Sequence, residues 1–342
     1  MSLKKPMVSI IVPIYNAELY LDDCLKSLVN QTMSDIEIVL INDGSLDKSE
    51  DICKKYMNED KRIVYKRIEN NGVSNARNIG MDISNADWIT FVDSDDWISL
   101  DYCEKLFEYV DDEIGMVIGR TVSVINGIVY DDQFHGLKCT YFKSDSDKLI
   151  LYRSIINDNP KIREYPHLAT CSAKLFKKSV IYNYNIRYSS HLKYYEDAVF
   201  NIRMIDKSQS VAVTSDILYY YRENDSSSTQ KFCADTVIKY ELAATEISEL
   251  MHSMRLPIQD DYDQFNVKNI DTIFINFFKD KNSIEVQYRF IKDCFNRNVF
   301  RESIKRINCR KLYPRRRAII ALNGKLRFYF LILIIYGRKT WI

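Results

Sequence analysis

The chain has 342 residues, of which 46% are hydrophobic and 13% aromatic, and its formal net charge is +1. This composition excludes a disordered protein, and the length allows one large domain or two ordinary ones. The charge is unevenly spread, because residues 301–342 carry twelve Lys and Arg against the single acid Glu302. Residues 1–300 therefore have a net charge of about −10, and the basic end predicts an anionic partner.

The cysteines and the apolar runs indicate a cytoplasmic protein. None of the eight cysteines has the spacing of a zinc site or of a redox C-x-x-C pair, so we expect reduced thiols. The first residues run straight into a strand without an apolar signal region. The apolar run Phe328–Tyr336 is shorter than the ~20 residues that a spanning helix needs.

Strand and helix patterns alternate over the first 110 residues. Apolar stretches typical of buried strands lie at 8–14, 36–41, 63–68 and 88–92, and helical patterns lie at 17–30, 47–57, 73–83 and 100–110. This order predicts an α/β fold with a mostly parallel sheet and helices on both faces. Ligands of such sheets bind beyond the carboxyl ends of the strands, where this chain has polar clusters.

The pattern changes after residue 115. Short strand-like pieces at 116–120 and 122–130 surround Asn126-Gly127, which predicts a hairpin. A helix is expected at 145–156, another after Glu196-Asp197, and three more at 232–254, 259–278 and 283–295. We therefore predict an α/β domain at residues 1–230 and a helical region at 231–342.

Asp93-Ser94-Asp95 directly follows a predicted strand. In an extended chain, residues i and i+2 point to the same face, so the two carboxylates are expected to converge. Hard divalent cations prefer such oxygen ligands, and a bound cation neutralises the charge that develops on a leaving diphosphate. The alternative is a helix cap, since Ser99 and Asp101 indicate that a helix begins nearby.

Two further polar residues have both a functional and a structural interpretation. Asp43, in Asp43-Gly44-Ser45, follows a strand and can accept an N–H from a nucleotide base, but the same residues also suit a plain turn. Arg77 can pair with the anionic part of a nucleotide, or it can brace an acidic loop.

Six ordered segments carry a resemblance to a known family. They are Val8–Asn16, Gln31-Thr32, Ile41–Asp47, Glu69–Gly72, Ala76–Gly80 and Phe91–Trp97. In order and spacing they resemble the family 2 glycosyltransferases, densely over residues 6–110 and thinly to about 230. The resemblance implies a Rossmann-like glycosyltransferase fold of type A, a divalent metal (Mn²⁺ or Mg²⁺), and inversion at the anomeric carbon.

The family pattern also implies roles for single residues. Pro13, Tyr15 and Asn16 would line the nucleoside pocket, and Asp43 would bind the base. Arg77 would lie near the nucleotide, and Asp93 near the ribose with Ser94 beside it. Asp95 would be the metal ligand, with Asp93 as a second one.

Tyr194-Tyr195-Glu196-Asp197 resembles the family's acidic pair at the start of a helix near the acceptor. An inverting displacement needs one base to take the proton of the acceptor hydroxyl. We assign Asp197 to that role, with Glu196 as the second candidate. The family often has Gly where Tyr195 stands, which bears on the acceptor geometry. The alternative is that both acids only favour the helix start through its dipole.

The absence of Gln-x-x-Arg-Trp, which marks processive synthases of this family, favours transfer of a single sugar. We therefore expect transfer from a UDP-sugar to a glycan or lipid-linked acceptor, in assembly of a bacterial capsule, exopolysaccharide or O-antigen. Two other functions were weighed. A sugar-nucleotide nucleotidyltransferase usually has a Gly-rich loop after its first strand, which Pro13–Ala17 is not. A non-catalytic, membrane-bound scaffold would keep the nucleotide pocket without turnover.

The C-terminal segment suggests a membrane contact. Arg315-Arg316-Arg317, Lys325 and Arg327 precede the apolar run, and Arg338-Lys339 and Trp341 follow it. Basic flanks beside an aromatic-rich apolar helix are typical of a helix lying in an anionic headgroup layer. This predicts a peripheral protein on the inner face of the cell membrane, and no signature of a nucleic-acid-binding fold is present. The alternative is that Phe328–Tyr336 docks on the protein's own core or on a partner subunit.

Overall fold

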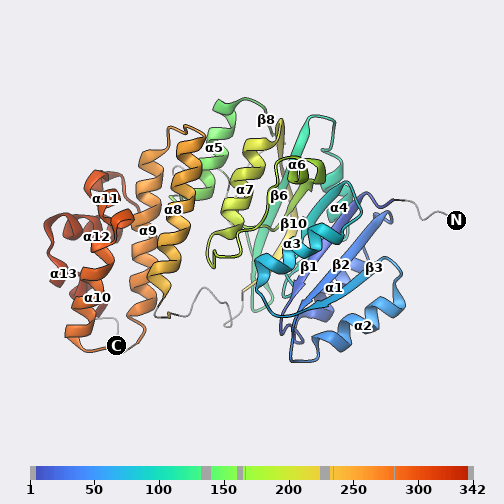
Figure 1. Ribbon diagram of the computed structural model, residues 1–342, viewed down its shortest axis with the longest axis horizontal. Coiled ribbons are helices and arrows are strands. Elements are labelled where there is room, and N and C mark those ends of the chain that lie inside the picture. The colour runs from blue at the N-terminus through green and yellow to red at the C-terminus, as the bar shows by residue number, and fades with distance from the viewer. Residues whose placement is uncertain are drawn as a thin grey trace. The chain divides into compact units, whose positions relative to one another are not determined.

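The computed structural model describes residues 5–131, 140–159, 165, 167–223, 232–233, 235–280 and 282–337. The chain forms two compact units, whose elements are labelled in Figure 1. The first comprises Met1–Leu151, Tyr165–His191 and Glu196–Asp225, and the second comprises Tyr152–Glu164, Leu192–Tyr195 and Ser226–Ile342. We expected one boundary near residue 230, and nothing in the sequence indicated that the two short inner segments belong with the C-terminal residues.

The first unit begins with four parallel strands in the order β3-β2-β1-β4. They are β1 Val8–Ile14, β2 Ile36–Asp43, β3 Ile63–Ile68 and β4 Trp88–Phe91, and the helices between them are α1 Leu21–Val29, α2 Ser49–Glu59 and α3 Val73–Ile83. All seven residues of β1 are buried, as expected for a central strand with both faces covered.

Helices cover both faces of β1. Ile10 and Val12 pack in one core with Leu25 of α1. Ile11, whose side chain points to the other face, meets α3 at Gly80, where an added Cβ would lie 2.3 Å from the Ile11 Cγ2 atom. The predicted α/β fold class is therefore confirmed.

Beyond β4 the sheet is mixed rather than parallel. Its remaining strands are β5 Trp97–Ile98, β6 Ile114–Ile125, β7 Ile128–Tyr130, β8 Thr140–Phe142, β9 Lys174–Lys177 and β10 Ser210–Arg222. β9 lies antiparallel between β4 and β6, and β6 pairs parallel with β10. The predicted hairpin is confirmed, since Asn126 (φ 51°) and Gly127 (φ 79°) connect β6 to β7. The strand and helix patterns of the sequence did not predict β9, because this strand is only four residues long and pairs with strands that are far away in the sequence.

Four more helices begin within the first unit. They are α4 Tyr102–Phe107, α5 Asp145–Ile156, α6 Lys178–Asn183 and α7 Glu196–Lys207. The boundary between the units falls inside α5, after Leu151. The expected helices at 145–156 and after Glu196-Asp197 are confirmed.

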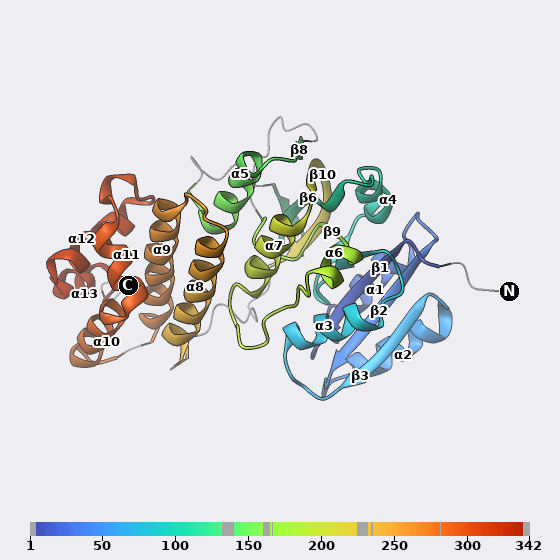
Figure 2. The same cartoon turned by 45° about the horizontal axis from the view of Figure 1, so that its top comes forward.

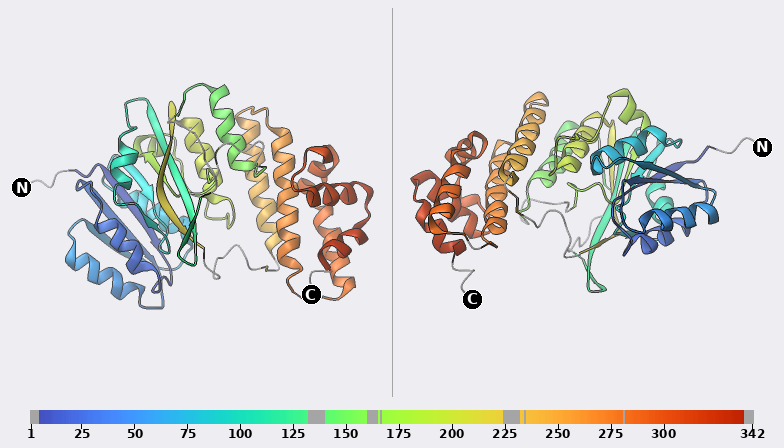
Figure 3. Two further views of the ribbon diagram at one scale, coloured as in Figure 1. Left: turned by 180° about the vertical axis from the view of Figure 1, so that it is seen from behind. Right: turned by 60° about the horizontal axis from the view of Figure 1, so that its bottom comes forward.

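The second unit is helical. Its elements are α8 Thr236–Ser253, α9 Gln259–Phe277, α10 Ile284–Asn296, α11 Asn298–Arg306, the 3₁₀ helix η2 Cys309–Lys311, α12 Arg315–Leu326 and α13 Tyr329–Gly337. Figure 2 shows α8 and α9 side by side, and both views of Figure 3 show the shorter helices next to α9. The three helices expected between 232 and 295 are confirmed, and they share one apolar core with α11–α13.

Helix α13 contains most of the apolar run for which we weighed a membrane contact. Its Tyr329, Ile332, Leu333 and Tyr336 are buried in the core of the second unit, as in the alternative in which this segment docks on the protein itself. Leu331 and Ile334 remain exposed on the other side of the helix. Arg338, Lys339 and Trp341 lie outside the described residues.

The basic end has an anionic partner within the same unit, namely the carboxylates of α9. Arg316 and Arg317 lie 3.0 and 3.1 Å from the buried Asp271, and Arg306 lies 2.7 Å from Asp263. The sequence predicted an anionic partner, but it did not indicate these acids, because they are separated from the arginines by more than 40 residues. Among the described residues, no helix combines the length and the apolar character that crossing a bilayer requires.

Candidate active site

The loops after β1 and β2 are joined by Asn16. Its backbone N–H donates to the Ser45 hydroxyl at 3.1 Å, and its side-chain oxygen accepts the Leu46 N–H at 2.8 Å. Asn16 has a positive φ of 49°, which turns the chain sharply at the carboxyl end of β1. Pro13 is buried within that strand, whereas the Tyr15 side chain next to Asn16 is 51% exposed.

Asp43 holds the loop that precedes α3. Its two carboxylate oxygens accept the backbone N–H groups of Asn71 at 2.9 Å and Gly72 at 2.8 Å. Gly44 has a φ of 72° and lies against this loop, since an added Cβ would come within 3.0 Å of the Asn70 nitrogen. Asp43 thus stabilises the loop before α3, which is a structural role of the kind that we considered as the alternative to base binding.

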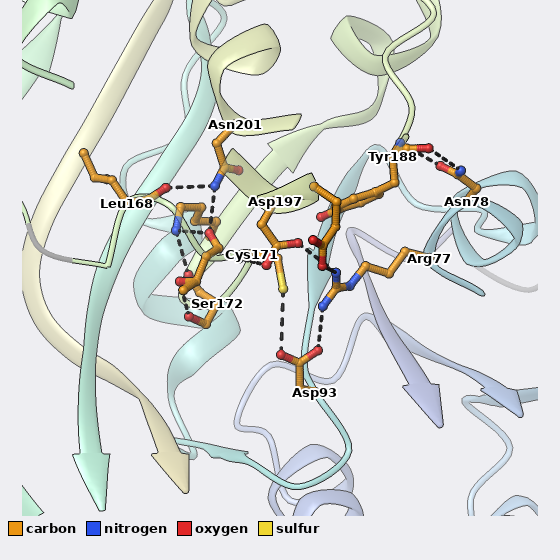
Figure 4. Close-up of polar contacts among 12 residues, drawn as sticks. Arg77, Asn78, Asp93, Leu168, Cys171, Ser172, Tyr188, Asp197 and Asn201 are labelled. Atoms are coloured by element: carbon orange, nitrogen blue, oxygen red, sulfur yellow. Dashed lines mark hydrogen bonds and ion pairs between the residues drawn. The ribbon is translucent and has the colours of Figure 1, made fainter. Parts of the chain in front are cut away.

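Arg77, in the second turn of α3, joins carboxylates from two distant parts of the chain. Its guanidinium lies 2.8 Å from Asp93 and 2.7 Å from Asp197, with Glu196 at 3.7 Å. Figure 4 shows it between the two aspartates, beneath the ring of Tyr188, whose centroid is 5.2 Å away. The Arg77 side chain is only 4% exposed. An arginine fork suits this bridge because its donors point toward two acceptors at once.

The turn Asp93–Asp96 does not cap a helix, because α4 begins only at Tyr102. The Asp93 N–H donates to the Tyr219 hydroxyl at 3.0 Å, and the Arg222 side chain donates to the Asp95 carbonyl at 2.9 Å. Strand β10, which carries both of these partners, therefore holds the turn in place. Asp93 and Asp95 are both partly exposed beyond the end of β4.

Asp96, the next residue, is buried and belongs to the same network. Its carboxylate accepts the Tyr219 hydroxyl and the Arg222 backbone N–H, both at 2.7 Å. Burial raises the pKa of Asp96 to about 8, and the charges of Asp93 and Asp95 contribute in the same direction. Three carboxylates thus gather at the end of one strand.

Asp197 is fixed from two sides at the start of α7. One carboxylate oxygen meets Arg77, and the other accepts the backbone N–H of Cys171 at 3.1 Å. Burial raises the pKa of the Asp197 carboxyl, and the charge of Arg77 opposes that effect. Burial also raises the pKa of Glu196, followed by the charge of Asp197. Both carboxyls therefore hold a proton more readily than ordinary surface acids.

Of the predicted site residues, Arg77, Asp93, Glu196 and Asp197 come together, while Asn16 and Asp43 bond to neighbouring loops. Sequence reasoning missed several partners of this cluster: Asp96, Cys171, Tyr188, Tyr219 and Arg222. Asp96 alone had a sequence signal, as the third acid after β4. The others belong to no motif and reach the site only through the tertiary fold.

A divalent metal would have suitable ligands at this turn. Among the described residues, no cluster of three or more His, Cys, Asp or Glu could hold a metal by itself. Metals in nucleotide sites usually take one or two carboxylates and complete their coordination with phosphate oxygens and water. The partly exposed Asp93 and Asp95 offer such a donor set, whereas Asp96 is buried and already accepts two hydrogen bonds.

Comparison with known proteins identifies the family of this chain. The profile of glycosyl transferase family 2 matches residues 9–182. EpsH of Bacillus subtilis is 34% identical over 238 residues, which are 67% of this chain and 64% of EpsH. The poly(ribitol-phosphate) beta-glucosyltransferase of Bacillus spizizenii is 31% identical over 63% of this chain and 32% of its own length. The chain thus spans less than two thirds of either relative.

A solved structure supports the fold over nearly the whole chain. The crystal structure of Staphylococcus aureus TarS 1–349 in complex with UDP-GlcNAc has a TM-score of 0.66 at 20% identity, covering 97% of this chain and 92% of that one. At this identity the likeness concerns the fold, which is that of a type A glycosyltransferase with a helical C-terminal region. The family match argues against the nucleotidyltransferase alternative. The chain belongs to glycosyl transferase family 2.

Proposed function

We propose that this enzyme transfers a single sugar from a UDP-sugar to a glycan or lipid-linked acceptor, with inversion at the anomeric carbon, during synthesis of a cell-surface polysaccharide. The observation that carries this proposal is the bridge from Asp93 through Arg77 to Asp197. It joins the end of the strands, at which the nucleotide would bind, to a carboxylate that is 18% exposed and can serve as a base. The relative that acts on poly(ribitol phosphate) supports a surface polymer as the setting.

The donor would bind at the carboxyl ends of β1, β2 and β4. The exposed Tyr15 ring can stack on a base, with Pro13 and Asn16 framing the same strand end. Each oxygen of a carboxylate can accept more than one hydrogen bond, so Asp43 can receive an N–H from the base while it holds the loop before α3. Arg77, Asp93 and Ser94 would lie near the ribose and the diphosphate.

Asp95, with Asp93 as second ligand, would hold Mn²⁺ or Mg²⁺ together with the donor diphosphate. Both carboxylates are partly exposed at the strand end, and their charges help to raise the pKa of the neighbouring, buried Asp96. The bound cation supplies charge neutralisation for the departing diphosphate. Tyr219 and Arg222 keep the turn in the conformation that presents these acids.

Asp197 would act as the base. The acceptor oxygen attacks C1 of the donor sugar, the bond between C1 and the diphosphate oxygen breaks, and the hydroxyl proton passes to the Asp197 carboxylate. Arg77 and the Cys171 N–H fix both oxygens of this carboxylate, so its orientation is set before the acceptor arrives. Glu196, one residue earlier, is the second candidate.

We also propose that the protein works in the cytoplasm, peripherally on the inner face of the cell membrane. Leu322, Leu326, Phe328 and Leu331 are exposed apolar side chains on and between α12 and α13, and the exposed Arg327 lies among them. An apolar strip beside cationic side chains suits an anionic headgroup layer, where a lipid-linked acceptor would be presented.

A donor-hydrolysis screen tests the catalytic proposal without knowledge of the acceptor. UDP-glucose, UDP-galactose and their N-acetylated amino-sugar counterparts are incubated with the full chain and Mn²⁺ or Mg²⁺, and released UDP is measured. We expect metal-dependent UDP release that is lost in Asp95→Ala and in Asp197→Asn, with UDP binding retained in Asp197→Asn. Full turnover of Asp95→Ala would refute the assignment of Asp95 as a metal ligand. Full turnover of Asp197→Asn would exclude Asp197 as the base.

A further inference from the structure

The loop at residues 167–173 is held by a buried lysine that belongs to no motif. Lys174, the first residue of β9, is 1% exposed. Its ammonium group lies 3.1 Å from the His167 carbonyl, 2.6 Å from that of Thr170 and 3.0 Å from that of Ser172. A lysine ammonium has three N–H donors, so the three carbonyls match its capacity. The loop therefore wraps around one buried charge.

The same loop is also held from α7. The Asn201 side chain donates to the carbonyl of Leu168 at 2.8 Å and to that of Thr170 at 2.7 Å. Asn201 lies four residues after Asp197 in this helix, so the two side chains share one face of it. Figure 4 shows both of them directed toward the loop that carries Cys171. Lys174 of strand β9 and Asn201 of helix α7 thus both donate hydrogen bonds to carbonyls of the loop.

The loop supplies a backbone N–H donor to the proposed base. The Cys171 N–H donates to one oxygen of Asp197 at 3.1 Å, while Arg77 occupies the other at 2.7 Å. Arg77 alone would let the carboxylate rotate about its terminal bond. The second donor fixes that rotation, and its position depends on the conformation of the loop.

We propose that Lys174 and Asn201 are positioning residues for glycosyl transfer, because they hold the 167–173 loop so that the Cys171 N–H orients the Asp197 carboxylate. Lys174 in addition stabilises the ionised carboxylate through its charge. This inference rests on the proposed function, in which Asp197 is the base.

A neutral side chain could not both hold the 167–173 loop and stabilise the ionised Asp197 carboxylate by its charge. Burying an ammonium group is costly unless its hydrogen bonds are satisfied, and three carbonyls satisfy them here. Burial lowers the pKa of Lys174 to about 8, and the charge of Asp197 opposes that shift. The charged and titratable groups that face Asp197 are Arg77, Asp93, Cys171, Lys174, Tyr188 and Glu196.

The competing interpretation is that Lys174 only stabilises the loop. Both interpretations predict a lower melting temperature for Lys174→Met. Only the positioning role predicts that turnover also falls and that the acid limb of the pH profile moves upward, since the ionised carboxylate loses a neighbouring cation. The pH profile therefore separates the two roles.

Lys148 provides a matched control. It is a second buried lysine in the first unit, and it donates to the Ser208 carbonyl at 2.7 Å. Burial lowers its pKa as well, so Lys148→Met removes a buried ammonium group of similar character. The nearby acids that act on its pKa are Asp145 and Asp206 rather than those of the active site.

The test uses the full chain and the UDP-sugar that the screen hydrolyses fastest. For Lys174→Met we expect kcat to fall about 10²-fold with little change in donor KM, and the acid limb to move up by about one pH unit. Asn201→Leu should lower kcat by about tenfold and move the acid limb up by less than Lys174→Met does, because it loosens the Cys171 N–H donor but removes no charge. Lys148→Met should retain the wild-type kcat and acid limb.

Two results would overturn the inference. One is a Lys174→Met enzyme with wild-type kcat and acid limb, and the other is an equal loss of kcat in Lys148→Met. If Lys174→Met does not fold, Asn201→Leu decides, and wild-type kcat in that variant overturns the inference. Failure of the proposed function looks different, because Asp197→Asn itself would then keep full turnover.

Discussion

Arg77 and Asp197 lie 120 residues apart in the chain and form an ion pair of 2.7 Å in the first unit. The same guanidinium reaches Asp93 at 2.8 Å, so one side chain connects the predicted nucleotide end of β4 with the predicted base on α7. We had weighed nucleotide contact against bracing of an acidic loop for Arg77. The bracing contact is present in the structure, and it gives the residue a direct influence on the position of the base.

Replacing Arg77 by lysine should lower the rate of UDP-sugar hydrolysis by about 10²-fold, because a single ammonium group cannot hold Asp93 and Asp197 in the same geometry. The melting temperature should fall as well, since carboxylates left without a partner in a buried place are destabilising. Thermal unfolding and hydrolysis assays measure both effects. Arg62→Lys, which changes a pair with Asp60 outside the cluster, is the control and should retain turnover.

Asp95 and Asp96 are adjacent in the sequence, but replacing Asp95 should affect metal-dependent activity, whereas replacing Asp96 should affect stability. Asp95→Ala should abolish metal-dependent hydrolysis with little effect on the melting temperature, because this carboxylate is partly exposed. Asp96→Ala should lower the melting temperature, because the Tyr219 hydroxyl and the Arg222 N–H lose their acceptor. Calorimetric titration of UDP with Mn²⁺ should show lost metal-dependent binding in Asp95→Ala. If Asp95→Ala lowered the melting temperature but still bound UDP with Mn²⁺, Asp95 would have a structural role rather than that of a metal ligand.

The pH dependence of turnover should follow the Asp197 carboxyl. A base must be ionised to accept a proton, so activity should decline as the pH falls through the pKa of this group. Burial raises that pKa above the ordinary aspartate value of 3.8, and the limb should therefore lie above this value. The measurement is kcat against pH from neutral to acid, with circular dichroism at each pH to verify folding. A rate that stays constant down to the ordinary aspartate range would argue against Asp197.

Membrane association should depend on the exposed side of α12 and α13. The side chains of Phe328 and Leu331 are 59% and 47% exposed, and replacing both by serine should lower binding to anionic vesicles by at least about tenfold. Cosedimentation with phosphatidylglycerol vesicles measures this, and neutral vesicles should bind less. Ile128→Ser, at a 58% exposed position in β7, is the control. Equal binding of all variants would indicate that this surface is not the contact.

Local patterns in the sequence were sufficient to predict the alternation of strands and helices up to α4, the residues at the strand ends and helices α8, α9 and α10 of the second unit. These features follow from local periodicity and from motifs whose members lie close together in the chain. Asp93, Asp95 and the acids that open α7 could be named because short-range patterns mark strand ends and helix starts.

The partners of those residues became apparent only in the folded chain. The bridge made by Arg77, the insertion of β9 between β4 and β6, and the pairing of Arg316 and Arg317 with Asp271 join segments separated by tens to more than a hundred residues. Periodicity carries no information about such contacts, because each depends on how the packed elements bring side chains together. For the same reason Lys174 and Asn201, which belong to no motif, became apparent as supports of the proposed base only in the folded chain.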